Sequence, residues 1–305
     1  MPIRPPLATG PFRSGERNMD NLARAAFRRR MEAEGPLMIP YCPDALTARL
    51  CEQLGFDGGY LGGGGLGLSL AVSEALLSLT ELAQAATAIR RRSALPLVVD
   101  GGVGFGDAVH VTRLVWELEA AGVHAIELED QVAPKRASHH RHVEHLIPVE
   151  EMLGKLRAAV AARRDPDLLL IARTGAVQNE SFDAAIERCE AYFTAGADVV
   201  MLLPENDEQR AAAPRRLSGP VALLTSFDLH GPQEWTESGY SLVIDPVTGQ
   251  TAAFSALREA YEAQRAGLPS ARPAAGSFAV YERMQDLAGF GELYDIERAT
   301  TEPGT

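Results

Sequence analysis

Charged side chains follow several short apolar runs of this sequence, at points where an unpaired charge is costly. Arg173 comes directly after the apolar run 168–172, while Asp100 and Glu129 follow runs of the same kind. A buried charge needs a partner of opposite sign, and a guanidinium can hold a carboxylate or phosphonate through two parallel hydrogen bonds. We therefore expect Arg173 to bind an anionic group of a substrate, with a salt bridge to Glu129 or Glu205 as the alternative.

The same acidic residues also suit a divalent cation. Glu129 and Asp130 are adjacent, and neighbouring carboxylates disfavour each other's charge unless a cation or an arginine compensates them. Asp100 precedes the glycine-rich stretch 101–106, where it can hold a cation or a water molecule, or cap the next helix. Glu205 adds a carboxylate after a later apolar run. These positions predict an acidic cluster that is compensated by a metal ion or by an arginine.

A polar segment at residues 132–145 follows this acidic pair. It contains Lys135, one of only two lysines in the chain, and four histidines, of which His139 comes first. A long segment without secondary structure of its own is often a lid over an active site. The histidine spacing matches no recognised zinc pattern. Solvated loop histidines and one acid–base or substrate-binding histidine remain as alternatives.

Four consecutive glycines, Gly62 to Gly65, follow another apolar run. Their backbone amides could form a concave nest that binds an anion. An acidic cluster, one deep arginine, glycine amides and a basic lid together favour a small anionic substrate, with or without a divalent cation.

The elements that must position these residues alternate along the chain. The sequence contains eight short apolar runs, at 37–39, 59–61, 97–99, 125–128, 168–172, 199–203, 221–224 and 242–244. Amphipathic stretches of helical period separate them, at 45–54, 80–91, 108–121, 149–162, 182–195 and 251–266. Uninterrupted apolar runs are typical of parallel strands that are covered on both faces. Eight β–α units predict a (β/α)8 TIM barrel. An open doubly wound sheet is the alternative, but no GxGxxG turn opens a first helix.

The expected organisation has three parts. Residues 1–20 are rich in proline, glycine and arginine and are predicted to form an irregular arm. Residues 21–266 form the barrel, and residues 267–305 form a connector and a terminal helix near 281–298. In such a barrel the active site lies at the carboxyl ends of the strands, which is where the charged residues above are found.

Composition excludes several classes of function. The chain has 305 residues and a formal net charge of −12, which argues against nucleic acid and anionic membranes as partners. No apolar stretch reaches the length of a membrane span. Its three cysteines are widely spread without a CxxC, so neither disulfides nor a cysteine zinc site is indicated, and a reducing cytoplasm is the expected compartment.

Several segments, taken in order, carry a family pattern. They are Tyr60 to Gly64, Asp100 to Gly106, Ile126 to Gln131, Pro134 to Arg136, Ile171 to Thr174, Ala195 to Asp198, Pro204-Glu205 and Leu287 to Glu297. Together they resemble the isocitrate lyase/phosphoenolpyruvate mutase superfamily, most closely its 2-methylisocitrate lyase and oxaloacetate decarboxylase branch. The resemblance implies a barrel whose terminal helix swaps between subunits, in a homotetramer built as a dimer of dimers.

The resemblance also implies roles for residues. Mg²⁺ would be held by carboxylates beside a 2-oxo acid or its enolate, with no organic cofactor. By position, Asp100 and Glu129 resemble the metal site, and Arg173, Lys135, His139 and Glu205 resemble the catalytic set. The substrate-binding positions are Tyr60, Gly62, Gly63, Gly64 and Ser138.

The sequence departs from this pattern at several site positions. Gly102 replaces a second aspartate, and Ser73 replaces an outer aspartate, with Glu74 adjacent. Ala137 replaces the cysteine that serves as general acid–base in the lyases, and Gly175 replaces another aspartate. We expect a weakened Mg²⁺ site, loss of ordinary methylisocitrate lyase activity and a pocket enlarged at its glycines.

The sequence thus predicts a carbon–carbon lyase that acts on a small carboxylate through an enolate. The alternatives are a repurposed family member, with metal-independent chemistry or a larger substrate, and a non-catalytic binding protein. Fold alone does not choose among them, because function lies in the site.

Overall fold

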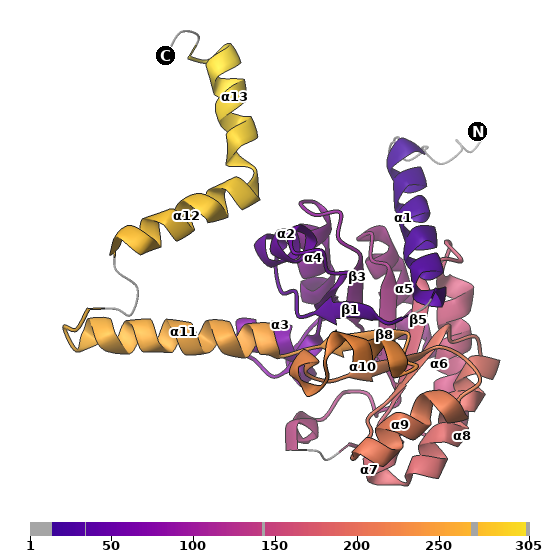
Figure 1. Ribbon diagram of the computed structural model, residues 1–305. Coiled ribbons are helices and arrows are strands. Elements are labelled where there is room, and N and C mark those ends of the chain that lie inside the picture. The colour runs from indigo at the N-terminus through magenta and orange to yellow at the C-terminus, as the bar shows by residue number, and fades with distance from the viewer. Residues whose placement is uncertain (1–13, 34, 142–143, 270–273, 303–305) are drawn as a thin grey trace, which may run out of the picture.

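The computed structural model describes residues 14–33, 35–141, 144–269 and 274–302 of the chain (Figure 1). It contains one sheet of eight parallel strands in the order β1-β8-β7-β6-β5-β4-β3-β2. The strands are β1 Leu37–Pro40, β2 Gly59–Leu61, β3 Leu97–Asp100, β4 Ala125–Glu129, β5 Leu169–Thr174, β6 Val199–Leu202, β7 Val221–Leu224 and β8 Leu242–Asp245. The first and last strands of this order meet where the amide of Cys42 donates to the carbonyl of Tyr60 at 2.8 Å. The predicted (β/α)8 barrel is confirmed.

Helices surround the sheet in the expected alternation. They are α1 Ser14–Glu32, α2 Ala45–Gln53, α3 Gly63–Ser69, α4 Leu79–Arg90, α5 Ala108–Ala120, α6 Val149–Ala162, α7 Ala176–Asn179, α8 Phe182–Thr194, α9 Asp207–Arg216, α10 Pro232–Glu237, α11 Thr248–Arg265, α12 Ala274–Ala288 and α13 Phe290–Thr300. Three short 3₁₀ turns are η1 Glu74–Leu76, η2 Ala137–Arg141 and η3 Phe227–Leu229. Local chemistry sets several boundaries. Ser78 and Glu81 form a capping box at α4, and Gly122 adopts a positive φ of 80° after α5.

The core has two layers. One lies between the sheet and the surrounding helices, and the other fills the inside of the barrel with alternate strand residues such as Ile39, Ile171 and Met201. Phe27 and Met31 of α1 join the inner layer. Helix α1 is also held by Arg24, which bonds to Asp165 at 3.0 Å and to the carbonyl of Val123 at 2.8 Å.

Helix α1 differs from the sequence expectation, since it begins at Ser14, within the stretch predicted to be irregular up to residue 20. Residues 1–13 lie outside the described residues. The helix forms because its residues 20–32 carry an amphipathic pattern whose apolar side chains fill the inner core. Apolar side chains fill the inside of the barrel, and the charged residues lie at the carboxyl ends of the strands.

The carboxyl-terminal part forms an arm of helices α11, α12 and α13. Helix α11 projects away from the barrel in Figure 1, whereas α12 contacts α2, and Arg92 donates to the carbonyl of Ala288 at 3.1 Å. No residue of α11 is buried among those described. The single terminal helix expected near 281–298 is in fact two helices, because Gly289 adopts a left-handed φ of 83° between them. No helix within the described ranges combines the length and apolar character required to cross a membrane.

Candidate active site

Charged side chains converge at the carboxyl ends of β2 to β5. We call this group the mouth cluster; its members are Glu74, Asp100, Glu127, Glu129, Lys135, His139 and Arg173. Five of these seven residues are among the predicted site residues, and Glu74 and Glu127 are additions. A cavity of about 660 Å³, the mouth cavity, opens above the cluster. It is lined by residues that include Tyr60, Gly62, Gly64, Asp100, His139 and Arg173.

Arg173 is buried on β5 and faces the mouth cavity. Its guanidinium contacts Glu127 at 2.5 Å and also pairs with Glu129, which is its neighbour in the register of β4 and β5. The alternative of a salt bridge to Glu129 is observed, while binding of a substrate anion stays a prediction, for which Arg173 lines a cavity. A guanidinium has more N–H donors than these two contacts use. Arg173 can therefore still bind an anionic group.

Glu127 is fully buried and lies between Arg173 and Tyr60, whose hydroxyl donates to it at 3.0 Å. Burial raises the pKa of Glu127 to about 7, and the nearby charges of Asp100 and Glu129 add to this effect against the opposing influence of Arg173. The sequence interpretation missed this residue because it lies inside an apolar run. Its separation by two from Glu129 was an available signal, since residues i and i+2 of a strand share a face.

Lys135 brings its ammonium group between two acids. Its Nζ pairs with Glu74 and lies 2.5 Å from Glu129 Oε1. Burial opposes the charge of Lys135, but the carboxylates of Glu129, Asp100 and Glu74 outweigh it, and the pKa is raised. A lysine that stays protonated can stabilise negative charge, and it is a poor general base.

His139 lies on η2, so the segment predicted to lack secondary structure contains one short helical turn. Its Nε2 is 2.7 Å from Glu74 Oε1, and its Nδ1 is 2.7 Å from the carbonyl oxygen of Arg136. Burial lowers the pKa of His139, but the bond to Glu74 outweighs it and the pKa is raised. The alternative of a solvated loop histidine is therefore wrong for His139, while its acid–base or substrate-binding role stays a prediction. His142 lies outside the described residues.

Asp100 is held by backbone amides. Its two carboxylate oxygens accept from Gly63 at 3.1 Å and from Gly102 at 2.8 Å. The prediction that the glycine amides bind a substrate anion is therefore wrong at Gly63. Gly62 is the N-cap of helix α3 and Gly63 its first residue, and the amide of Gly63 donates to the carboxylate of Asp100. Burial raises the pKa of Asp100.

The expected enlargement of the pocket at its glycines is wrong at Gly62 and Gly175 and stays a prediction at Gly102. A side chain at Gly62 would meet the ring of Tyr60 at 2.7 Å, and one at Gly175 would meet Glu144 Oε2 at 1.5 Å, so neighbouring side chains fill both spaces. At Gly102 the nearest atom lies 3.9 Å away, and it belongs to Glu129. Space is open only there among these three glycines.

Two predicted site residues lie away from the cluster. Glu205 is exposed, because β6 ends at Leu202 and the chain turns outward into the Asn206 cap of α9. Its backbone amide donates to Gln209 Oε1 at 2.8 Å. Ser138 is partly buried beside His139, and it is not among the described residues that line the mouth cavity.

Asp130, adjacent to Glu129, has a structural role. Its carboxylate accepts from Thr174 Oγ1 at 2.6 Å, from the Tyr192 hydroxyl at 2.6 Å and from Arg188 at 3.3 Å. The negative charges of Glu129 and Asp130 are thus compensated by two different arginines, one for each carboxylate.

The carboxylates of the mouth cluster are candidate ligands for a metal ion. In the described part of the chain, no group of three or more His, Cys, Asp or Glu side chains is arranged to hold a metal ion. Oxygen ligands of the kind that Mg²⁺ prefers are present in Asp100 and Glu129. Lys135 already neutralises one of them. The donor atoms therefore suit Mg²⁺, while the internal ammonium weakens the need for it.

The chain is similar in sequence and in structure to known proteins. Residues 27–265 match the family model described as phosphoenolpyruvate phosphomutase. The chain is 39% identical over 246 residues to 2-methylisocitrate lyase of Aeropyrum pernix, covering 77% of this chain and 79% of that protein. It is 32% identical over 289 residues to 2,3-dimethylmalate lyase of Eubacterium barkeri, covering 90% and 96%. A solved structure of phosphonopyruvate hydrolase in complex with oxalate and Mg²⁺ is similar, with a TM-score of 0.78, 29% identity and coverage of 92% and 99%.

Proposed function

Because this chain belongs to the phosphoenolpyruvate phosphomutase family, we propose that it is a carbon–carbon lyase that acts on a small carboxylate through an enolate. One observation carries the proposal. The guanidinium of Arg173 lines a cavity at the carboxyl ends of the strands while two buried carboxylates hold it in place. A cation fixed in this way is suited to bind the carboxylate of a substrate.

The other members of the mouth cluster receive roles from their contacts. Lys135 stabilises the negative charge that develops on the enolate oxygen, since its pKa is raised and it remains an ammonium. His139 transfers a proton to or from the substrate, with Glu74 orienting its ring. Tyr60 and Gly64 contribute to the walls of the substrate site. Glu205 is not retained in the catalytic set, because it is exposed.

We also propose that Asp100 and Glu129 hold Mg²⁺ weakly. When bound, the cation would stabilise the enolate as a Lewis acid. The proposal is supported by the oxygen donors of these two residues and by the excess of acids over permanent cations in the mouth cluster. The Mg²⁺ in the phosphonopyruvate hydrolase complex is consistent with it.

Turnover by an arginine variant tests the central role of Arg173. The substrates are those in the names of the relatives, 2-methylisocitrate, 2,3-dimethylmalate and oxaloacetate. We expect the wild type to cleave at least one, and Arg173→Lys to lower kcat/KM by about 10- to 100-fold, because lysine keeps the charge and loses the paired hydrogen bonds. The matched control Arg24→Lys changes a buried arginine that binds Asp165, outside the mouth cluster. Equal turnover by all three proteins would contradict the proposal.

Chelation separates this function from its alternative. We expect removal of divalent cations with EDTA to lower kcat by at least about tenfold, and MgCl₂ to restore it. Full turnover after exhaustive chelation would favour the metal-independent alternative, which the ammonium of Lys135 at Glu129 supports. Substrate binding without any product under either condition would favour a binding protein.

The proposal extends to assembly and compartment. We propose a homotetramer, arranged as a dimer of dimers, in which the helices of the arm pack on a neighbouring subunit. Support comes from the exposed apolar side chains of the arm, such as Phe254 and Tyr261. We propose the cytoplasm as the compartment, supported by three buried cysteines that are all free.

A further inference from the structure

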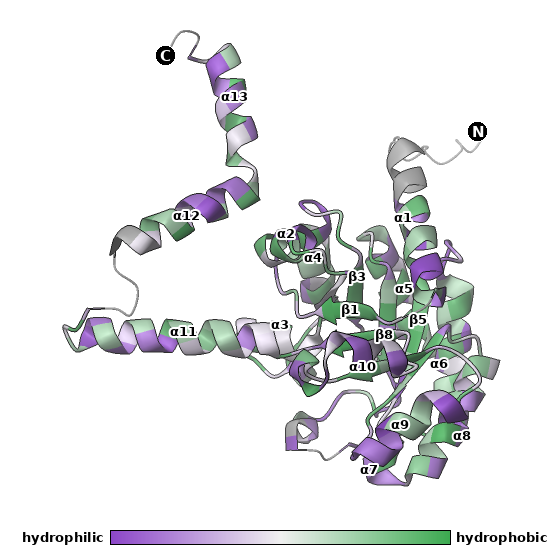
Figure 2. Ribbon diagram, in the orientation of Figure 1, coloured by the Kyte–Doolittle hydropathy of each residue, from purple (hydrophilic) through white to green (hydrophobic). Residues whose placement is uncertain are grey.

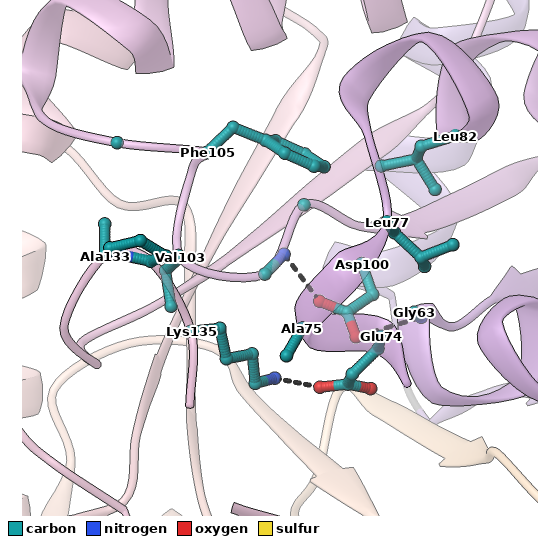
Figure 3. A pocket seen from close by; sticks show the side chains of 14 residues that line it. Gly63, Glu74, Ala75, Leu77, Leu82, Asp100, Val103, Phe105, Ala133 and Lys135 are labelled. Atoms are coloured by element: carbon teal, nitrogen blue, oxygen red, sulfur yellow. Dashed lines mark hydrogen bonds and ion pairs between the residues drawn. The ribbon is translucent and has the colours of Figure 1, made fainter. Parts of the chain in front are cut away.

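A second cavity, the side cavity, lies next to the mouth cluster. It has a volume of about 330 Å³, and its walls are largely apolar, with Leu77, Leu82, Val103 and Phe105 among them. Figure 3 shows the ring of Phe105 and the side chains of Leu77 and Leu82 around it. These four side chains are apolar, so the part of the cavity that they line suits an apolar group.

The side cavity and the mouth cavity share a wall. Glu74 and Asp100 line both, and Lys135 lines the side cavity at the same point. In Figure 3 the ion pair of Lys135 with Glu74 and the carboxylate of Asp100 lie along one edge of the apolar walls. A ligand whose charged end is bound at the mouth cluster therefore has an apolar space within reach of its next atoms.

The loop that forms the far wall has an unusual backbone. Phe105 has a φ of 59°, which is rare and unfavourable for a bulky side chain, and it stands between Gly104 at 81° and Gly106 at 157°. Strain of this kind persists where the surrounding structure requires it, and it is concentrated at functional sites. Here the strained conformation places an aromatic ring over the cavity (Figure 3).

Gly102 also lines the side cavity. It has no side chain, and the position that a Cβ would occupy is 3.9 Å from the nearest side-chain atom, on Glu129. The glycine therefore leaves the space beside it unfilled.

We propose that the side cavity binds an alkyl substituent of the carboxylate substrate, so that the enzyme prefers branched, alkyl-bearing acids over unsubstituted ones. The inference rests on the proposed function, because it takes the mouth cluster as the site of the carboxylates. It adds the substrate class, and it assigns Leu77, Leu82 and Phe105 to recognition of the substituent.

Binding of two unreactive dicarboxylates tests the inference without any need for turnover. Malonate and propylmalonate are titrated into the full chain by calorimetry, in a buffer that contains MgCl₂. Partial burial of the apolar propyl group favours binding, so we expect propylmalonate to bind roughly tenfold more tightly than malonate. Equal affinities for the two ligands would overturn the proposal.

A variant that fills the cavity sharpens the test. Ala75 lines the side cavity and lies near Lys135 in Figure 3. We expect Ala75→Leu to abolish the preference for propylmalonate while malonate binds within about twofold of the wild type, since the lost contacts involve only the propyl group. The control Ala211→Leu makes the same change at an exposed position of α9 and should keep the preference. A preference that survives in Ala75→Leu would also overturn the proposal.

Xenon distinguishes failure of this inference from failure of the proposed function. An apolar cavity takes up xenon whether or not a carboxylate binds nearby. In crystals under xenon pressure we expect density between Phe105 and Leu82 in the wild type and none in Ala75→Leu. Absent malonate binding with xenon present would reject the anion site and retain the apolar site, whereas absent xenon would reject the apolar site.

Discussion

Charge compensation at single residues governs the barrel mouth. Glu129 and Asp130 are neighbours in sequence, yet β-strand geometry sends their side chains to opposite faces. Glu129 faces inward and meets Arg173 and Lys135, while Asp130 faces outward and meets Arg188. Burial alone raises the pKa of both carboxyls, but the two cations beside Glu129 hold its pKa below the ordinary value. The two adjacent acids therefore differ in surroundings: Glu129 belongs to the mouth cluster, and Asp130 belongs to a buried network that joins β4 to β5 and α8.

His124 provides a residue-scale prediction about pH. It is buried, its Nδ1 accepts from the amide of Leu97 at 3.3 Å, and burial together with Arg90 and Arg24 depresses its pKa well below 6.5. The unfolded chain takes up a proton on this histidine below about pH 6.5 and the native chain does not, so the free energy of unfolding falls as pH falls. We expect His124 to contribute a slope of up to about 1.4 kcal/mol per pH unit below that value.

The measurement is urea denaturation between about pH 5 and pH 7. His124→Gln keeps a neutral acceptor near Leu97 and cannot gain a proton, so its slope should be smaller than that of the wild type. His110, an exposed histidine that pairs with Asp107, serves as the control in a His110→Gln variant. Parallel slopes for His124→Gln and the wild type would show that His124 is not the buried neutral group described.

Residues that end strands were the predictable part of the site. Arg173, Asp100 and Glu129 follow apolar runs, and parallel strands bring such positions to one end of a barrel. Glu74 was not predicted as a site residue, since it comes from η1 after the glycine run, and its approach to His139 depends on how two loops pack. Glu205 shows the reverse error, because a residue three positions beyond a strand end can turn outward with its loop.

At the scale of elements, periodicity located all eight strands and placed the helix 149–162 to the residue. It missed short elements whose sequence has no amphipathic period. Helix α3 begins in a run of glycines, which have low helix propensity. It is held by tertiary contacts, for a side chain at Gly65 would meet the ring of Tyr41 at 2.2 Å. Tertiary packing therefore decides elements that propensity alone would reject.

Asp130 links three elements, and we expect its loss to lower the stability of the fold. It joins the end of β4 to Thr174 of β5 and to Tyr192 and Arg188 of α8, and its carbonyl accepts from the amide of Ile147, just before α6, at 2.8 Å. Asp130→Ala would leave the buried hydroxyls of Thr174 and Tyr192 without this acceptor, while Arg188 keeps its pair with Glu180. We expect a loss of about 3 kcal/mol in the free energy of unfolding.

Denaturant titration checks this value against a matched exposed pair. Asp183 pairs with Arg216 on the surface, and Asp183→Ala should cost less than about 1 kcal/mol. Asp130→Asn, which keeps the size and part of the hydrogen bonding, should fall between the two. Similar losses for Asp130→Ala and Asp183→Ala would mean that the buried network does not tie these elements together.

At the scale of the whole molecule, helices cover the sheet of the barrel, whereas many apolar side chains of the arm are exposed. Helix α11 takes the place of the eighth barrel helix in sequence, yet it projects away from the sheet in Figure 1. Figure 2 shows apolar residues along α11, α12 and α13. Phe254, Tyr261, Phe278 and Tyr281 are 67%, 62%, 70% and 58% exposed, respectively. Exposed apolar surface is typical of interaction sites, and it is the observation that supports the proposed packing of the arm on a neighbouring subunit.

Substitution on the arm tests the proposed assembly. Phe254 and Leu257 are exposed neighbours on α11, and a charge in place of each would be costly to bury in an interface. We expect multi-angle light scattering to give a tetramer mass for the wild type and a lower mass for Phe254→Asp/Leu257→Asp. The control Val109→Asp places the same charge on an exposed apolar residue in the first turn of α5, where an acid is favourable, and should leave the mass unchanged. A monomeric wild type, or a double variant that keeps the wild-type mass, would contradict packing of the arm on a neighbouring subunit.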